Sequence, residues 1–212
     1  MEIILFLIAI AGFVFTIIIH EVSHGLMADH LGDPTARLSG RLTLNPIPHI
    51  DIYGSILLPL FLVLIHSPFM FGWAKPVPFD PYNLKDPKKD SALIALAGPA
   101  SNIIIATILA IIYRFVPNQI ASGIIIEIIE FNVALAVFNL IPIHPLDGGK
   151  ILVGVLPYKE AQEFDSFMNR FGLILLFIFI FPLFGGVSLF SMYLYPVISF
   201  ILNLLIPGFG TI

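Results

Sequence analysis

The chain has no cysteine and little charge, and each lack excludes a class of protein. Without cysteine, its 212 residues offer no disulfide framework, no thiolate metal site and no thiol nucleophile. Only 11% of the residues are charged. A soluble domain needs roughly 25%, so lipid must form much of the surroundings of this chain. The ten Lys and Arg residues form no basic stripe, and we therefore expect no nucleic-acid partner.

The N-terminus also lacks the basic region and the small-residue cleavage site of a signal peptide. The first nineteen residues, MEIILFLIAIAGFVFTIII, carry one charge, at Glu2. This apolar run continues directly into HEVSHGLMADHL. We therefore expect a helix that is retained.

Long apolar runs are what the chain has in abundance, with 58% hydrophobic residues and a mean hydropathy of +1.00. They cover residues 3–31, 54–72, 91–113, 122–143, 171–184 and 187–206. A membrane-spanning helix takes about 20 residues, so the first, third and fourth are long enough. Pro182 and Gly185-Gly186 divide the last two and predict a C-terminal helical hairpin over about 168–206.

We therefore predict a mainly α, polytopic membrane protein. No polar stretch is long enough for a separate soluble domain, because domains run from about 50 residues upward. The expected organisation is one integral membrane domain over 1–212, with its core at about 3–155.

Two stretches do not have the pattern of a helix. Residues 35–45, TARLSGRLTLN, alternate polar and apolar side chains around Ser39-Gly40, which predicts a small β-hairpin. Residues 73–90 contain four prolines and four lysines and predict a polar loop, with Trp73 as an anchor at the membrane interface.

The sequence HEVSH at 20–24 places two histidines and a glutamate inside an apolar run. His20 and His24 are four residues apart, so on a helix their rings lie one turn apart on the same face, a suitable arrangement for one Zn²⁺. Glu21 lies beside them and can accept a proton from a water molecule that the metal holds. Ionisable residues inside membrane helices are rare and usually functional, which favours a metal site over a merely structural pair.

A catalytic zinc needs a third protein ligand. The candidates near the ends of apolar segments are Glu127, Glu130, Asp147 and His144. Asp147 is followed by two glycines, which permit a tight turn that directs its short carboxylate back toward the helices. His144 is the rival, but Pro145 between the two residues makes a shared helical face unfavourable.

Three motifs in this order and spacing resemble the site-2 protease family of intramembrane zinc metalloproteases. They are HEVSH at 20–24, AGPASN at 97–102 and NLIPIHPLDGG at 139–149, with GRLTLNPIPHID and GWAKPVPF between them. The resemblance is to the compact prokaryotic branch, without an appended soluble domain. It implies a catalytic core of three helices that carry HEVSH, GPASN and the NxxP–LDGG segment.

The resemblance also implies roles for single residues. His20, His24 and Asp147 would hold one zinc ion, and Glu21 would be the general base. Substrate or oxyanion contacts would come from Asn139, Pro145 and Asn102. Asn139 could instead cap a helix, and Asn102 could pack the middle helix together with Gly98. The hairpin at 35–45 would pair its free edge with the unwound substrate.

The two halves of the metal site constrain the topology. HEVSH and Asp147 both lie toward the C-terminal ends of their apolar segments, so the first and fourth segments should run in the same direction. Residues 54–72 must then enter and return, or lie peripherally, with bends at Pro59 and at 66–68. Basic residues would gather on one side, the cytoplasmic one: Arg37, Arg41, Lys75, Lys85, Lys88, Lys89, Lys150 and Lys159.

The predicted function is that of an intramembrane zinc metalloendopeptidase in a prokaryotic cell membrane, with its active site toward the cytoplasmic side. Its partners would be transmembrane protein substrates and lipid; the sequence indicates no oligomeric state. One alternative is a metal transporter, although six scattered histidines suggest no series of sites along a path. Another is an inactive member that binds transmembrane helices, which the intact HExxH and LDGG motifs disfavour.

Overall fold

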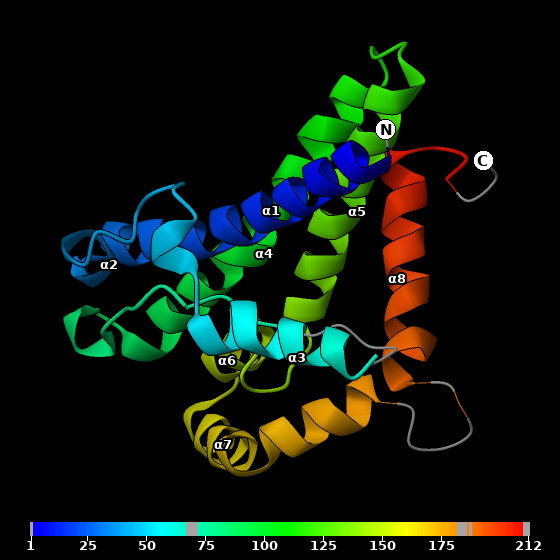
Figure 1. Ribbon diagram of the computed structural model, residues 1–212. Helices are drawn as coiled ribbons and strands as arrows, with labels where there is room; N and C mark the ends of the chain where they lie inside the picture. The colour runs from blue at the N-terminus through cyan, green and yellow to red at the C-terminus, as the bar shows by residue number, and fades with distance from the viewer. Residues whose placement is uncertain (1, 67–71, 182–185, 187, 210–212) are drawn as a thin grey trace.

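The computed structural model describes residues 2–66, 72–181, 186 and 188–209, and within them the chain is mainly helical (Figure 1). The helices are α1 (Glu2–Leu31), α2 (Thr35–Leu38), α3 (Leu58–Leu64), α4 (Pro87–Tyr113), α5 (Gln119–Asn139), α6 (Asp147–Val155), α7 (Tyr158–Ile180) and α8 (Leu189–Leu205). Short 3₁₀ turns at Ile47–His49 and Pro81–Asn83 and a π-helical stretch at Ile52–Leu57 complete the elements. No strand occurs among the described residues.

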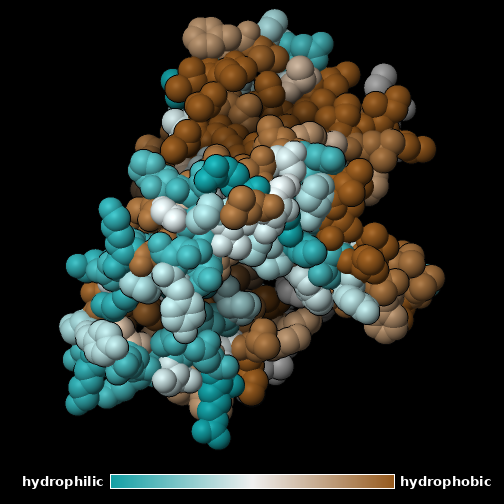
Figure 2. Space-filling view, turned by 90° about the vertical axis from the view of Figure 1, so that its left-hand side faces the viewer, coloured by the Kyte–Doolittle hydropathy of each residue, from teal (hydrophilic) through white to brown (hydrophobic). Residues whose placement is uncertain are grey.

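Three helices are long and apolar enough to cross a membrane: Ile3–Leu31, Pro87–Tyr113 and Gln119–Asn139. Large apolar side chains stay exposed on them, for example Phe6 at 64%, Ile104 at 58% and Ile120 at 51%. On the face in Figure 2, apolar residues cover the top, while hydrophilic ones gather lower down. Lipid satisfies such an exposed apolar surface and water does not, so the chain is an integral membrane protein.

α4 is the centre of the bundle and packs against both α1 and α5. It presents small buried side chains, Ala106 and Ala110, to Ile129 and Val133 of α5, which are fully buried. Small residues let helix backbones approach closely, and this packing drives association where lipid is the solvent. α8 closes the far side of the same apolar cluster with Leu194 and Leu202.

α1 and α5 run in the same general direction. A Cβ on Gly12 would lie 2.9 Å from Ile128, and Thr16, one turn later, contacts Asn132, also one turn later. The contacts advance together along both helices, so their C-terminal halves lie on the same side of this crossing. The topology argument required this direction, and it brings HEVSH toward the LDGG motif.

The two ends of the segment at 54–72 lie side by side. The N–H of Trp73 donates to the carbonyl of Gly54 at 3.2 Å, and the Ser55 hydroxyl donates to the carbonyl of Trp73 at 2.8 Å. Since the two ends are hydrogen-bonded to each other, the segment is not a single crossing from one side to the other, which agrees with the expectation that it enters and returns or lies peripherally. Pro59 is the second residue of α3, and Ser67 and Pro68 lie outside the described residues.

The prediction of a β-hairpin at 35–45 is wrong. Thr35–Leu38 form a short helix, and Gly40 at φ 64° turns the chain afterwards. The buried carboxylate of Asp33 accepts hydrogen bonds from the backbone N–H and the hydroxyl of Thr35, two residues later, and so forms a local turn in place of strand pairing. Alternation over a few residues is a weak strand signal when a nearby side chain offers the backbone other hydrogen-bond partners.

Two further boundaries differ from expectation. The third core helix ends at Asn139, and Asp147 begins the separate short helix α6, so NxxP and LDGG lie on different elements. At the C-terminus both expected helices are present, but α7 begins at Tyr158 and lies crosswise to α8 (Figure 1). The first half of α7 is polar, and such a helix suits the membrane interface better than a crossing.

Candidate metal centre

His20 and His24 lie one turn apart on α1, with their imidazole rings side by side. The ring centroids are 4.6 Å apart with the planes at 89°, and the two Nε2 atoms are 3.1 Å apart. Both side chains are largely buried. The helical spacing thus places two nitrogen atoms at one point inside the bundle.

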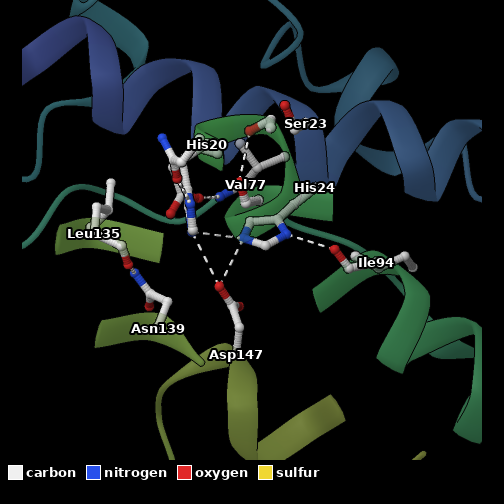
Figure 3. A network of polar contacts seen from close by, with 12 residues as sticks. His20, Ser23, His24, Val77, Ile94, Leu135, Asn139 and Asp147 are labelled. Carbon is white, nitrogen blue, oxygen red and sulfur yellow. Dashed lines mark hydrogen bonds and ion pairs between the residues drawn. The ribbon is translucent and has the colours of Figure 1, made fainter. Parts of the chain in front are cut away.

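Asp147 reaches the same point from the start of α6. Its Oδ2 atom lies 3.1 Å from His20 Nε2 and 3.3 Å from His24 Nε2, and Figure 3 shows the carboxylate directed at both rings. The three atoms all lie within 4.8 Å of one another. Burial alone would raise the pKa of Asp147, but the hydrogen bonds and charges of the two histidines lower it to about 2. The carboxylate is therefore ionised at neutral pH.

The Nδ1 atom of each ring, on the side away from Asp147, has a hydrogen-bond partner on α4. His24 Nδ1 lies 2.7 Å from the carbonyl oxygen of Ile94 on α4, and His20 Nδ1 lies 2.6 Å from Asn102 Oδ1. A backbone carbonyl can only accept, so Nδ1 of His24 carries a proton and Nε2 is the nitrogen left for a cation. Histidines that bind metals commonly donate their second N–H to such an acceptor.

This donor set fits a zinc ion. Two imidazole nitrogens and one carboxylate oxygen are the protein ligands of a catalytic zinc, which keeps a further position open for water. Three electron-pair donors that converge within about 3 Å repel one another unless a cation lies between them. His20, His24 and Asp147 are the residues that could hold it.

Gly98 of the AGPASN motif lets α4 approach the two rings. A Cβ atom at this position would lie 2.5 Å from Nε2 of His24 and 2.7 Å from Cε1 of His20. No side chain fits into that space, so glycine is required here for close approach. α4 thereby forms the wall behind the metal centre.

Glu21 lies beside the metal centre but makes a different contact. Its Oε2 atom accepts a hydrogen bond of 2.8 Å from the backbone N–H of Val77. Val77 belongs to the loop over residues 73–80, which has no regular secondary structure and lies more than fifty residues further along the chain. The carboxylate next to the proposed ligands is thus held by a loop.

Arg41 holds this loop in place. Its guanidinium donates to the carbonyl oxygens of Lys75 at 2.6 Å and of Pro76 at 3.1 Å, and the residue is only 7% exposed. The residue that was expected to form a β-hairpin strand thus positions the backbone that binds Glu21.

Comparisons with known proteins agree with this site. The model of peptidase family M50 matches residues 119–179, which include Asp147. The Bacillus subtilis protein named "Putative zinc metalloprotease YwhC" is 34% identical over 174 residues, 77% of this chain and 76% of its own length. The chain belongs to peptidase family M50. It is a membrane zinc metalloprotease of the site-2 protease type.

More distant relatives give the same result for this M50 peptidase. The Mycobacterium tuberculosis protein Rip2, whose name carries the same description, is 27% identical over 85% of this chain and 70% of its own. "Zinc metalloprotease MJ0392" of Methanocaldococcus jannaschii is 37% identical over 35% of this chain and 22% of its own. No solved structure is significantly similar to this M50 peptidase.

The remaining predicted site residues of the M50 peptidase lie around the centre. Asn102 is fully buried behind His20, on the side of the ring that faces away from Asp147. The Asn139 side chain donates to the carbonyl of Leu135, on its own helix, at 3.0 Å (Figure 3). Pro145 is exposed in the connection between α5 and α6.

His144, the rival ligand, is not among the converging atoms. Its Nε2 atom lies 3.2 Å from Asp165 Oδ1 of α7. A Cβ on Gly149 would lie 3.1 Å from Nδ1 of His144, and one on Gly148 would lie 2.3 Å from the carbonyl of Leu140. The two glycines therefore serve close packing of a helix start, and neither has the positive φ of the tight turn expected there.

Several contributors to the centre have no motif that would have indicated them. The carbonyl of Ile94 and the N–H of Val77 are backbone groups, which a sequence does not distinguish from any other. Thr16 and Asn132 carried a weak signal, as polar side chains in the middle of apolar helices.

Proposed function

We propose that this M50 peptidase is an intramembrane endopeptidase that hydrolyses peptide bonds of transmembrane protein substrates. The observation that carries the proposal is the convergence of His20, His24 and Asp147 next to Glu21, within helices whose outer surface suits lipid. A peptide bond must enter the bundle to reach these residues, and a membrane-embedded substrate is the one best placed to do so.

One zinc ion, held by His20 Nε2, His24 Nε2 and Asp147 Oδ2, would polarise the peptide carbonyl and acidify a water molecule. The protein's own contribution is to hold these three atoms ready. The Nδ1 bond of His24 to Ile94 and the ionised state of Asp147 keep two of the ligands in the form that binds a cation.

Glu21 is the proposed general base. The Val77 N–H binds Oε2 and so orients the carboxylate, while Oε1 accepts no hydrogen bond from the described residues. We assign to this oxygen the proton of the attacking water, which Glu21 then delivers to the nitrogen of the leaving amine. A carboxylate that is already held in the right orientation can take up the proton and pass it on without first having to be reoriented.

Asn139 and Pro145 remain proposed substrate contacts. The Asn139 amide now donates to Leu135, so it would have to turn from its own helix to a substrate carbonyl. The proposed unit is the whole chain, 1–212, as one membrane peptidase domain.

The proposed orientation follows from the charges. Most of the basic residues flank the ends of α1, α4 and α6 that carry the metal centre, whereas Arg114 lies at the opposite end of α4. By the positive-inside rule, the site lies toward the cytoplasmic side of a prokaryotic cell membrane. The returning segment at 54–72 is consistent with this arrangement, because it lets α1 and α5 run in the same direction.

Two variants test the mechanism in purified protein reconstituted with a single-span membrane protein as the substrate. Glu21→Gln should keep zinc, measured by atomic absorption, and lose activity by roughly 10²–10⁴-fold, because a neutral amide accepts no proton. Asp147→Ala should lose the metal itself, since one of three protein ligands is gone. Glu163→Gln, at an exposed position of α7, is the matched control and should behave like wild type.

Cleavage at the wild-type rate by Glu21→Gln would contradict the proposed mechanism. Zinc content unchanged in Asp147→Ala but lost in His144→Ala would show that the third ligand is the rival histidine.

A further inference from the structure

A chain of buried polar side chains leads from the metal centre into the apolar interior. Thr16 of α1, Asn102 of α4 and Asn132 of α5 are each at most 2% exposed, and each lies within a membrane-spanning helix. Burying such groups is costly unless every donor and acceptor is paired. These side chains are hydrogen-bonded to one another in a continuous series.

The chain begins at His20. Its Nδ1 atom lies 2.6 Å from Asn102 Oδ1, and Asn102 Nδ2 lies 2.9 Å from Asn132 Oδ1. Asn132 Nδ2 in turn lies 3.0 Å from the Thr16 hydroxyl and 2.8 Å from the carbonyl of Ile128. The Thr16 hydroxyl then donates to the carbonyl of Gly12 at 3.0 Å.

The far end of this chain determines its direction. The carbonyl of Ile128 can only accept, so the amino group of Asn132 must face it and the amide oxygen must face Asn102. Asn102 then presents its amino group to Asn132, which leaves its oxygen toward His20. The orientations of both amides thus follow from the carbonyl of Ile128, which can accept a hydrogen bond but cannot donate one.

The last step concerns the imidazole. An amide oxygen facing Nδ1 requires a proton on Nδ1, and Nε2 is then the nitrogen that points toward His24 and Asp147 and is left for a cation. His24 reaches the same state through one bond to the Ile94 carbonyl. The proton on Nδ1 is therefore held in two different ways. In His24 a backbone carbonyl accepts it, and in His20 the side chain of Asn102 accepts it and is itself oriented by Asn132.

We infer that Asn132 is a positioning residue for the metal centre: through Asn102 it keeps the proton of His20 on Nδ1 and leaves Nε2 free for a cation. This inference rests on the proposed function only in taking His20 Nε2 as a ligand. The carbonyl of Thr16 also lies 3.4 Å from Asn102 Nδ2, so loss of Asn132 should weaken the orientation of Asn102 without abolishing it.

The test is Asn132→Leu, which has a similar volume and no polar atoms. ¹⁵N NMR of metal-free protein labelled at histidine reports whether each Nδ1 carries a proton, and zinc affinity is measured in the same preparation by competition with a chelator. In wild type, both His20 and His24 should show a protonated Nδ1. In Asn132→Leu, the His20 signal should move toward the unprotonated position while His24 is unchanged. Zinc affinity should fall about 10–100-fold, as for loss of other groups that orient a ligand.

Asn203→Leu is the matched control. Asn203 also donates to the carbonyl four residues earlier, that of Ser199, at 2.8 Å, but it is exposed on α8 and contacts no part of the centre. The same substitution there should leave both signals and the zinc affinity unchanged.

An unprotonated Nδ1 of His20 in the wild-type protein would overturn the inference without any variant. A wild-type signal and wild-type zinc affinity in folded Asn132→Leu would overturn it as well. Neither readout uses peptide cleavage, so an active Glu21→Gln enzyme would contradict the proposed function and leave this result standing.

Discussion

The metal centre has two sides that are built differently. On the helical side, formed by Ile94, Gly98 and Asn102 of α4 with Asn132 behind them, every contact comes from the interior of a long helix. On the loop side, Glu21 is held by the N–H of Val77, in a segment that Arg41 ties down. The helical side binds the proposed ligands and the loop side binds the proposed base.

The difference separates two properties of the enzyme. Helices packed at native density hold atoms firmly, whereas a loop held by a few hydrogen bonds opens at a lower free energy. We therefore expect damage on the helical side to lower metal affinity. Damage on the loop side should lower turnover and leave the metal bound.

The largest effect should come from Gly98→Ala on the helical side. The new Cβ would lie 2.5 Å from His24 and 2.7 Å from His20, so both rings must move. Zinc affinity should fall by about 100-fold or more, beyond the effect of a single lost orienting contact, and peptidase activity should fall with it. Zinc competition measures the first and cleavage of a single-span substrate the second.

Gly123→Ala is the control for this helix-interior substitution. Nothing lies within 4 Å of a Cβ at Gly123 of α5, so zinc affinity should not change, and alanine should stabilise the helix by about 0.5–1 kcal/mol. Unchanged zinc affinity in Gly98→Ala would show that α4 does not form the wall behind the ligands.

A smaller effect, limited to turnover, should follow from Arg41→Met. Methionine keeps the apolar stem but loses the hydrogen bonds to the carbonyls of Lys75 and Pro76, so the loop no longer holds Val77 firmly against Glu21. Since a hydrogen bond from a charged group is worth about 1.5–3 kcal/mol, kcat/KM should fall about 10-fold or more, with zinc affinity unchanged.

Arg37→Met is the matched control. Arg37 is exposed and pairs with Asp29 at the surface, an interaction worth at most about 1 kcal/mol, and activity should stay as in wild type. A parallel loss of zinc in Arg41→Met would break the distinction between the two sides.

The smallest effect should come from Asp33→Asn, at the base of the loop side. The Asp33 carboxylate accepts hydrogen bonds from Thr35, from the Asn83 side chain and from the N–H of Asp80. An amide oxygen replaces only part of this set. We expect trypsin to cut at Lys85 a few-fold faster, corresponding to about 1 kcal/mol in local opening.

The same residue predicts a dependence on pH. Burial would raise the pKa of Asp33, but its hydrogen bonds from Thr35, Asn83 and Asp80 lower it below the ordinary value. Its contribution to stability is therefore complete above the ordinary pKa, near 4, and disappears as the pH falls through the lower, folded value. The difference in thermal midpoint between wild type and Asp33→Asn should be largest at pH 7 and should shrink below pH 4. A difference that grows with acidity would contradict this sign.

The sequence predicted the helical side well and the loop side poorly. HEVSH lies in a long apolar run, where helical periodicity leaves one arrangement for His20 and His24. Residues 35–45 offered alternation over a short stretch, and the local hydrogen bonds of Asp33 to Thr35 outweighed it. That the segment at 54–72 is not a single crossing could be predicted because the first and fourth segments had to run in the same direction.

By itself, the sequence determined that the chain is a membrane protein, which residues can carry metal chemistry and which face of α1 presents them. Composition and helical spacing are local properties, and they suffice for that. The tertiary structure decided which groups bind Glu21, which residues orient the histidines and where Gly98 approaches them. Those contacts join atoms many tens of residues apart, such as Thr16 with Asn132 and Glu21 with Val77. Only the packing of the helices and the loop brings them within hydrogen-bond distance.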